Sequence, residues 1–163
     1  HEVLYVNYYL NFRHIGKVSK YCHFCNNIET INHLFLECKT VSPLNKHILK
    51  IFNMSERYKL SLSEIIFRHL FFKITDNNIH KLLLILLTES HFVIWSCRNA
   101  VKYDQKTYSS SAIISRFNNR LKLRILTDFE RLSPISFNDL WCNSSLCKLD
   151  ETTKAVIFDK AIN

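Results

Sequence analysis

Glycine and proline are scarce in this chain of 163 residues, which contains one glycine and two prolines. These residues supply most tight turns, so their scarcity argues against a β-sandwich and against a disordered tail. Hydrophobic residues make up 47% of the sequence, which is enough to bury a core. We therefore predict an all-α fold, built as one domain or as a small metal module joined to one helical domain.

Long apolar runs and the usual signatures of an active site are also missing. The apolar run at residues 82–87 is only six residues long, whereas a helix that crosses a bilayer needs about 20. We therefore expect a buried central helix there and no membrane contact. No glycine-rich phosphate loop or Ser-His-Asp set appears, and the acids are scattered. We predict that this chain alone is not an enzyme and has no small-molecule substrate.

Acidic residues are fewer than basic ones, because 14 Asp and Glu stand against 22 Lys and Arg, a formal net charge of +8. Such an excess favours an anionic partner, above all RNA or DNA. The excess decides little by itself, since many basic domains of this size bind nothing anionic.

The six cysteines have two readings. An even number suggests a disulfide framework if the chain is secreted. Three of them, however, stand with a histidine at metal-ligand spacings, and the chain does not open with the charged start and apolar run of a secretory signal. We therefore expect reduced thiols and an intracellular setting, nuclear or cytoplasmic.

Cys22, Cys25, His33 and Cys38 follow the spacing Cys-x2-Cys-x7-His-x4-Cys. Two such thiolates can bind one ion from a tight turn, and the His and the last Cys can complete a tetrahedron from the start of a helix. The sequence therefore predicts one Zn²⁺ ion. The alternative is a coincidence of buried thiols and a helical histidine, which four residues at these spacings disfavour. His23 is excluded as a ligand because adjacent residues rarely reach one ion together.

The residues between these ligands fit the same site. Asn26 and Asn27 tolerate the left-handed turn that a return to the metal requires. Thr30 can cap a short helix that carries His33, with the two apolar residues after it turned toward the rest of the fold. Because protein ligands fill all four positions, none is left for a reactive water, and we expect a structural ion.

Residues 21–38 carry a family resemblance. Here a Cys-x-x-Cys is followed by an acidic-Thr pair, a His-Leu-Phe and a closing Cys. This arrangement resembles the zinc-binding domain at the carboxyl end of non-LTR (LINE-type) retrotransposon reverse transcriptases. A retroviral nucleocapsid knuckle has a shorter spacing than the seven residues found here between the second Cys and the His, which excludes that smaller relative.

Two flanking segments resemble the same family more loosely. Residues 10–19 are similar to its apolar, basic lead-in, and residues 92–99 to its aromatic-Ile-Trp-x-x-Arg-Asn helix. The polymerase aspartates of the family have no counterpart, and nothing after about Tyr103 carries the resemblance. It implies a non-catalytic tail that helps to hold template RNA or target DNA during target-primed reverse transcription. The rest of the reverse transcriptase polyprotein would be a partner, and we expect this chain, which starts at His1, to be a piece of it.

Helical spacing of apolar residues predicts the scaffold, a CCHC zinc module packed on a bundle of about four helices. Serine caps, a proline in a first turn and a capping box mark several helix starts. The expected helices cover residues 3–12, 42–53, 61–72, 75–103 and 112–132. The expected domains are 1–41 with the zinc module, 42–132 with the bundle, and a tail at 133–163.

Aromatic residues crowd the first of these helices, where Tyr5, Tyr8, Tyr9 and Phe12 stand at helical spacings. We interpret them as core residues, and a base-stacking platform is the alternative.

Two groups of residues are candidates for nucleic-acid binding. One is the basic connector with the metal turn, and the other is the first three turns of the helix at 112–132, where a solvated face is an equal alternative to phosphate contact. The candidates are Arg13, Lys17, Lys20, His23, Phe24, Arg116, Arg120, Lys122 and Arg124.

The tail after residue 132 contains fewer features that indicate a structure or a function. Cys142 and Cys147 are interpreted as free thiols rather than half of a second metal site, and residues 150–162 as a short helix or a frayed end. The alternative function for the whole chain is a zinc-stapled helical module that binds another protein. Salt separates the two functions, because nucleic-acid binding weakens steeply as salt is added.

Overall fold

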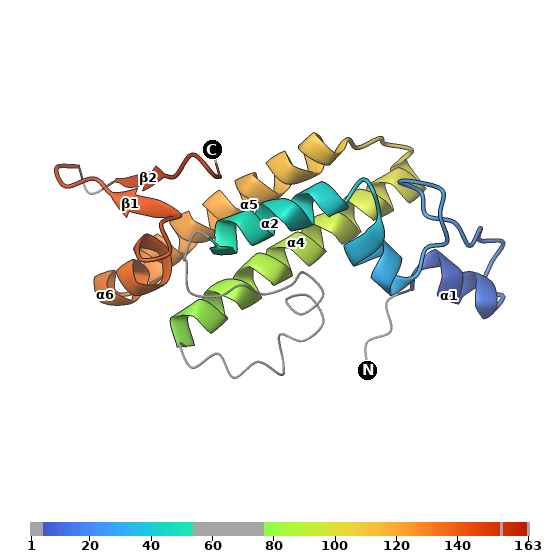
Figure 1. Ribbon diagram of the computed structural model, residues 1–163, viewed down its shortest axis with the longest axis horizontal. Coiled ribbons are helices and arrows are strands. Elements are labelled where there is room, and N and C mark those ends of the chain that lie inside the picture. The colour runs from blue at the N-terminus through green and yellow to red at the C-terminus, as the bar shows by residue number, and fades with distance from the viewer. Residues whose placement is uncertain (1–4, 54–76, 154, 163) are drawn as a thin grey trace.

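The computed structural model describes residues 5–53, 77–153 and 155–162. These residues are mostly helical, as the composition predicts. Figure 1 shows the long helices α4 (Asn77–Asp104) and α5 (Ser110–Arg131) lying side by side with α2 (Ser42–Asn53) along them. The short helix α1 (Asn7–Phe12) lies at one end of this assembly and α6 (Pro134–Phe137) at the other. The predicted helix at 61–72 lies outside the described residues.

Helix α4 is the central helix that the sequence predicts. Within the described part of the chain it is the one helix long and apolar enough to cross a membrane, by length and composition only. It packs against α2, α5 and the turn that carries His33. Leu83, Leu86 and Ile94 are buried on it, and so are two charged residues, Glu89 and Arg98. Burial on several sides is typical of the core helix of a globular domain.

The predicted start of α2 is confirmed, and α5 has the predicted serine cap but begins at Ser110, two residues earlier than expected. Helix α2 begins at Ser42, with Pro43 in its first turn, where a missing N–H costs nothing. The side chain of Ser109 accepts a hydrogen bond from the Ala112 N–H at 3.2 Å and caps α5. The apolar stripe of α5 faces the core, with four members fully buried: Ile113, Phe117, Leu121 and Ile125.

The short helix or frayed end predicted for residues 150–162 is wrong, and the fold is therefore not purely α-helical. After α6 comes a π-turn, η2 (Asn138–Cys142), and then strand β1 (Cys147–Leu149) pairs antiparallel with β2 (Val156–Phe158). Asp150 fixes the connection, because its side chain accepts hydrogen bonds from the N–H groups of Thr152 and Thr153.

The aromatic residues at 5–12 are mostly not core. That interpretation is wrong for Tyr5, which precedes α1, and for Tyr8 and Phe12 on the helix, because all three are exposed. Only Tyr9 packs partly against the core. The inward side of α1 carries a buried polar residue, Asn7, instead. Helical spacing places Tyr8 and Phe12 on one side of α1, but it does not indicate that this side faces outward.

Candidate metal centre

The first two candidate ligands lie on a tight turn. The Cys22 N–H donates to the Asn27 carbonyl at 2.6 Å, and the Asn26 N–H donates to the Cys22 carbonyl at 2.8 Å. Asn26 adopts a left-handed conformation with φ of 64°, as its residue type predicts. A bridge between Tyr21 and Ile28 closes the base of the turn. The two thiols therefore face the same space.

The other two ligands are joined by one π-turn, η1 (His33–Glu37). The predicted cap is confirmed, because the side chain of Thr30 accepts from the His33 N–H at 3.0 Å. The Cys38 N–H donates to the His33 carbonyl at 2.7 Å, a bond that spans five residues and brings both side chains to one side. Leu34 and Phe35 are buried, as expected, and hold the turn on the core.

The four side chains converge. One donor atom from each of Cys22, Cys25, His33 and Cys38 lies within 4.8 Å of the other three. The Sγ atoms of Cys22 and Cys38 are 4.0 Å apart, and Cys25 Sγ is 3.1 Å from His33 Nε2. A tetrahedral Zn²⁺ with ordinary bond lengths separates two sulfurs by about 3.8 Å and a sulfur from a nitrogen by about 3.6 Å. The group can therefore hold a metal ion with small shifts.

The thiols of Cys22 and Cys38 influence one another. The hydrogen bond between them, followed by burial, raises the pKa of Cys22, whereas the same bond lowers the pKa of Cys38 to about 5. Backbone N–H groups of Thr40 and Val41 also favour the Cys38 thiolate, and that of Phe24 favours the Cys22 thiolate. These N–H groups would stabilise the negative sulfurs that a dication requires.

A buried ion pair joins the segment that carries the candidate ligands to α4. Arg98 Nη2 lies 2.6 Å from Glu29 Oε1, and the two side chains are 1% and 0% exposed. Asn7 completes the network, because its N–H donates to Glu29 and its side-chain oxygen accepts from Arg98 at 2.7 Å and from Lys102 at 3.3 Å. Buried charges need such partners.

These network residues are the part of the site that the sequence interpretation missed. Glu29 and Arg98 are separated by 69 positions, although each lies in a segment that carries the family resemblance. An arginine directly after the apolar pattern of residues 92–97 was the available signal, because a charged residue on a buried helix must find an opposite charge.

The predicted nucleic-acid residues near the metal turn are accessible. Arg13, Lys17, Lys20 and His23 are exposed, whereas Phe24 is half-buried against the core, so only His23 projects outward as expected. A depression of about 540 Å³ borders the turn and is lined by residues that include Tyr21, His23, Phe24 and Lys39.

The candidates on α5 have partners within the chain. Arg116 donates to Tyr108 Oη at 2.7 Å, Arg120 pairs with Glu89 at 2.6 Å, and Arg124 pairs with Asp128 at 3.1 Å. The Lys122 ammonium lies 5.7 Å from the centre of the Phe158 ring. Their role in nucleic-acid binding stays a prediction, and a phosphate would have to share these cations with their present partners.

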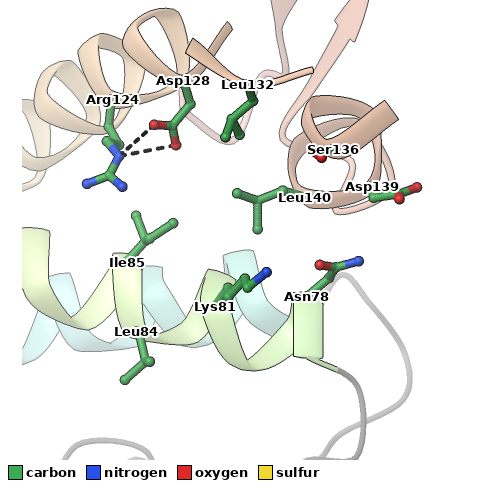
Figure 2. Close-up of a pocket in the computed structure, with 10 residues that line it drawn as sticks. All are labelled: Asn78, Lys81, Leu84, Ile85, Arg124, Asp128, Leu132, Ser136, Asp139 and Leu140. Carbon is green, nitrogen blue, oxygen red and sulfur yellow. Dashed lines mark hydrogen bonds and ion pairs between the residues drawn. The ribbon is translucent and has the colours of Figure 1, made fainter. Parts of the chain in front are cut away.

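A cavity of about 480 Å³ lies away from the metal centre, between the start of α4, the end of α5 and α6. Figure 2 shows Arg124 and Asp128 paired on one wall, with Asn78 and Lys81 of α4 across from them. Leu140 reaches into the space between the walls. Arg124 and Asp128 are paired with each other, and Lys81 and Asp139 are the other charged residues that line the cavity.

Cys142 and Cys147 are free thiols, as predicted. Burial, followed by the nearby Cys142, raises the pKa of Cys147 to about 12. Among the residues with described coordinates, they are not part of a group that could hold a metal ion. Among the described residues, the group of side chains that could hold a metal ion therefore lies within residues 22–38.

Comparisons of this chain with models of protein families, with curated proteins and with solved structures found no match. The family expectation therefore depends on the residues of the chain itself.

Proposed function

We propose that this chain binds one structural Zn²⁺ through Cys22, Cys25, His33 and Cys38 and acts as a non-catalytic, nucleic-acid-binding tail. The family it resembles is the reverse transcriptases of non-LTR retrotransposons. In this role the ion fixes the metal turn, and the turn presents a basic surface to template RNA or target DNA. Zn²⁺ suits the donor set, because three thiolates and one imidazole are the ligands of closed structural zinc sites.

The observation that carries the proposal is the link between the two segments that resemble the family. Glu29 comes from the zinc segment and Arg98 from the aromatic helix, and they form the buried ion pair at 2.6 Å. The aromatic helix resembles the family more loosely than the zinc segment does, and its contact with that segment supports reading the two as one unit. Glu29 lies between the ligands Cys25 and His33 in the sequence, so the pair ties the ligand segment to the helical scaffold.

Charge around the metal turn supports a polyanionic partner. Residues 5–28 contain Arg13, Lys17 and Lys20 and no aspartate or glutamate. The first acid that follows, Glu29, is buried and paired with Arg98. The cations at 13–20 therefore have no acid within residues 5–28, and Glu37 is the one exposed acid of residues 5–41. Phosphate groups that bind these cations would release counterions.

A protein-interaction module is the second candidate, and the arginines of α5 favour it. Arg116, Arg120 and Arg124 are engaged with Tyr108, Glu89 and Asp128. Cations that are already paired offer less to a phosphate backbone and are compatible with a structural role. On this reading the zinc only fastens the amino-terminal part to the helices that bind the partner.

Two measurements test the proposal on the full chain. Native mass spectrometry under reducing conditions should find one zinc per chain, and a chain without metal would overturn the zinc site. Fluorescence anisotropy with a labelled RNA and a single-stranded DNA should show binding that weakens steeply between low and physiological salt. Absence of such binding, with zinc present, would favour the protein-interaction module.

A further inference from the structure

Two exposed aromatic rings lie in parallel on α1. The rings of Tyr8 and Phe12 are one helical turn apart, with centroids separated by 6.4 Å and planes inclined by 15°. Their side chains are 46% and 65% exposed, and Tyr5, just before the start of α1, is 57% exposed. A contiguous group of exposed aromatic rings marks an interaction surface, since water contact costs these side chains free energy.

The attachment of α1 to the fold does not need these rings. Asn7 Nδ2 donates to the Tyr21 carbonyl at 2.7 Å, and Asn11 Nδ2 donates to the Val18 carbonyl at 2.9 Å. These two asparagines are one turn apart and hold α1 against the connector. The aromatic side is therefore left available to a partner.

Cations lie next to α1, because Arg13 directly follows Phe12 and the connector that the two asparagines hold against the helix carries Lys17 and Lys20. The Arg13 guanidinium lies 5.6 Å from the centre of the Tyr9 ring, and the Lys20 ammonium lies 5.6 Å from the Tyr21 ring. Lys17 is exposed between them in sequence. An apolar protein surface would gain nothing from this basic border. A strand of nucleic acid offers both flat bases for the rings and phosphates for the cations.

We propose that Tyr8 and Phe12 form a stacking platform for unpaired bases of single-stranded nucleic acid, with Arg13, Lys17 and Lys20 holding its phosphates. The inference rests on the proposed nucleic-acid function and narrows its substrate to single strands. In a duplex each base is already stacked between neighbours and presents only an edge, so the platform would have no face to contact.

The test is fluorescence anisotropy of the full chain with a labelled single-stranded oligothymidine of about 20 nucleotides and with a duplex of equal length. The double variant Tyr8→Leu/Phe12→Leu keeps apolar side chains and removes the π-faces. We expect it to weaken single-strand binding about tenfold or more, with an unchanged slope of log affinity against log salt, because no charge is lost. The matched control Phe129→Leu, near the opposite end of the molecule, should bind as wild type does.

Three outcomes separate the platform from the broader function. Wild type that binds neither oligonucleotide overturns both proposals. The platform alone is overturned if wild type binds with steep salt dependence and the double leucine variant binds equally well. It is also overturned if wild type prefers the duplex. A Tyr8→Trp variant covers the case in which the leucine variant loses α1. Its added fluorescence should be quenched when the oligothymidine stacks on the introduced indole, and an unquenched signal in the bound state overturns the platform.

Discussion

Buried side chains differ in kind between residues 5–41 and the helices α2, α4 and α5. In the amino-terminal part they include metal-ligand donors and a charged network, with Cys22, His33 and Glu29 among them. Between the helices they are mainly aliphatic and aromatic, with Leu86 and Phe117 fully buried. The first region depends on a few directional contacts, whereas the second depends on apolar area. We therefore expect the two regions to fail separately.

The two regions also have different expected roles: the amino-terminal part presents the proposed binding surface, and the helices support it. The helices bury their apolar stripes and provide a stable base, which is where free energy from apolar burial accumulates. The amino-terminal part presents charged and aromatic groups outward and is held to that base by Arg98 and Phe35. A surface built this way can be lost without loss of the helices, which gives three ways to test the comparison.

The largest effect is expected from removing two ligands together, in the variant Cys22→Ser/Cys25→Ser. A structural zinc contributes about 10 to 16 kcal/mol of apparent binding free energy in small peptides, and much of that is folding free energy. Amide hydrogen exchange should show residues 5–41 unprotected, while α2, α4 and α5 stay protected. Wild type treated with a strong chelator should behave in the same way.

Cys142→Ser is the control for that variant, because Cys142 is half-buried like Cys25 but lies outside the ligand group. It should keep both the zinc and the exchange pattern of the wild type. Equal protection of residues 5–41 in the double serine variant would mean that the amino-terminal part does not depend on a metal.

The second effect concerns the attachment between the two regions. Arg98→Met keeps most of the side-chain volume but leaves Glu29 buried and without its partner, which typically costs about 3 to 5 kcal/mol. We expect a lower melting temperature with the zinc retained. Adding Glu29→Gln to this variant should recover part of the loss, since the unpaired charge is then gone. Calorimetry of the single and double variants measures both changes.

Lys102→Met is the control for Arg98→Met. Lys102 lies one helical turn further along α4 and contacts the same network, at 3.3 Å from Asn7 Oδ1, but it is only half-buried. Its loss should cost about 1 kcal/mol or less. If both methionine variants lose the same stability, the buried pair is not what joins the regions.

Local features of this molecule could be predicted from the sequence, because they depend on neighbours in the chain. The ligand spacing of residues 22–38, the Ser109 cap and the apolar stripe through Phe117 each follow from short-range geometry. The convergence of four donors is in this class, since all of them lie within 17 consecutive residues.

Features that depend on distant contacts could not be predicted in the same way. The pairing of Glu29 with Arg98 spans 69 positions, and periodicity carries no information on which helix meets which loop. Strands β1 and β2 are three residues each, too short for an alternating pattern to be read. The outward direction of Tyr8 and Phe12 depended on which side of α1 meets the fold, and two asparagines decide that.

The smallest of the three effects should come from the helical region itself, in the variant Leu86→Ala. Leu86 is fully buried on α4, so its truncation should cost about 2 to 5 kcal/mol through lost transfer free energy and a cavity. The lower end of this range lies below the about 3 to 5 kcal/mol typical of Arg98→Met, which is why we place this effect last. The melting temperature should fall while native mass spectrometry still finds zinc at 25 °C, because no ligand or network residue has changed. If this variant loses its zinc while its helices remain folded, the comparison is contradicted. The amino-terminal part would then depend on apolar packing in α4 rather than on its own directional contacts.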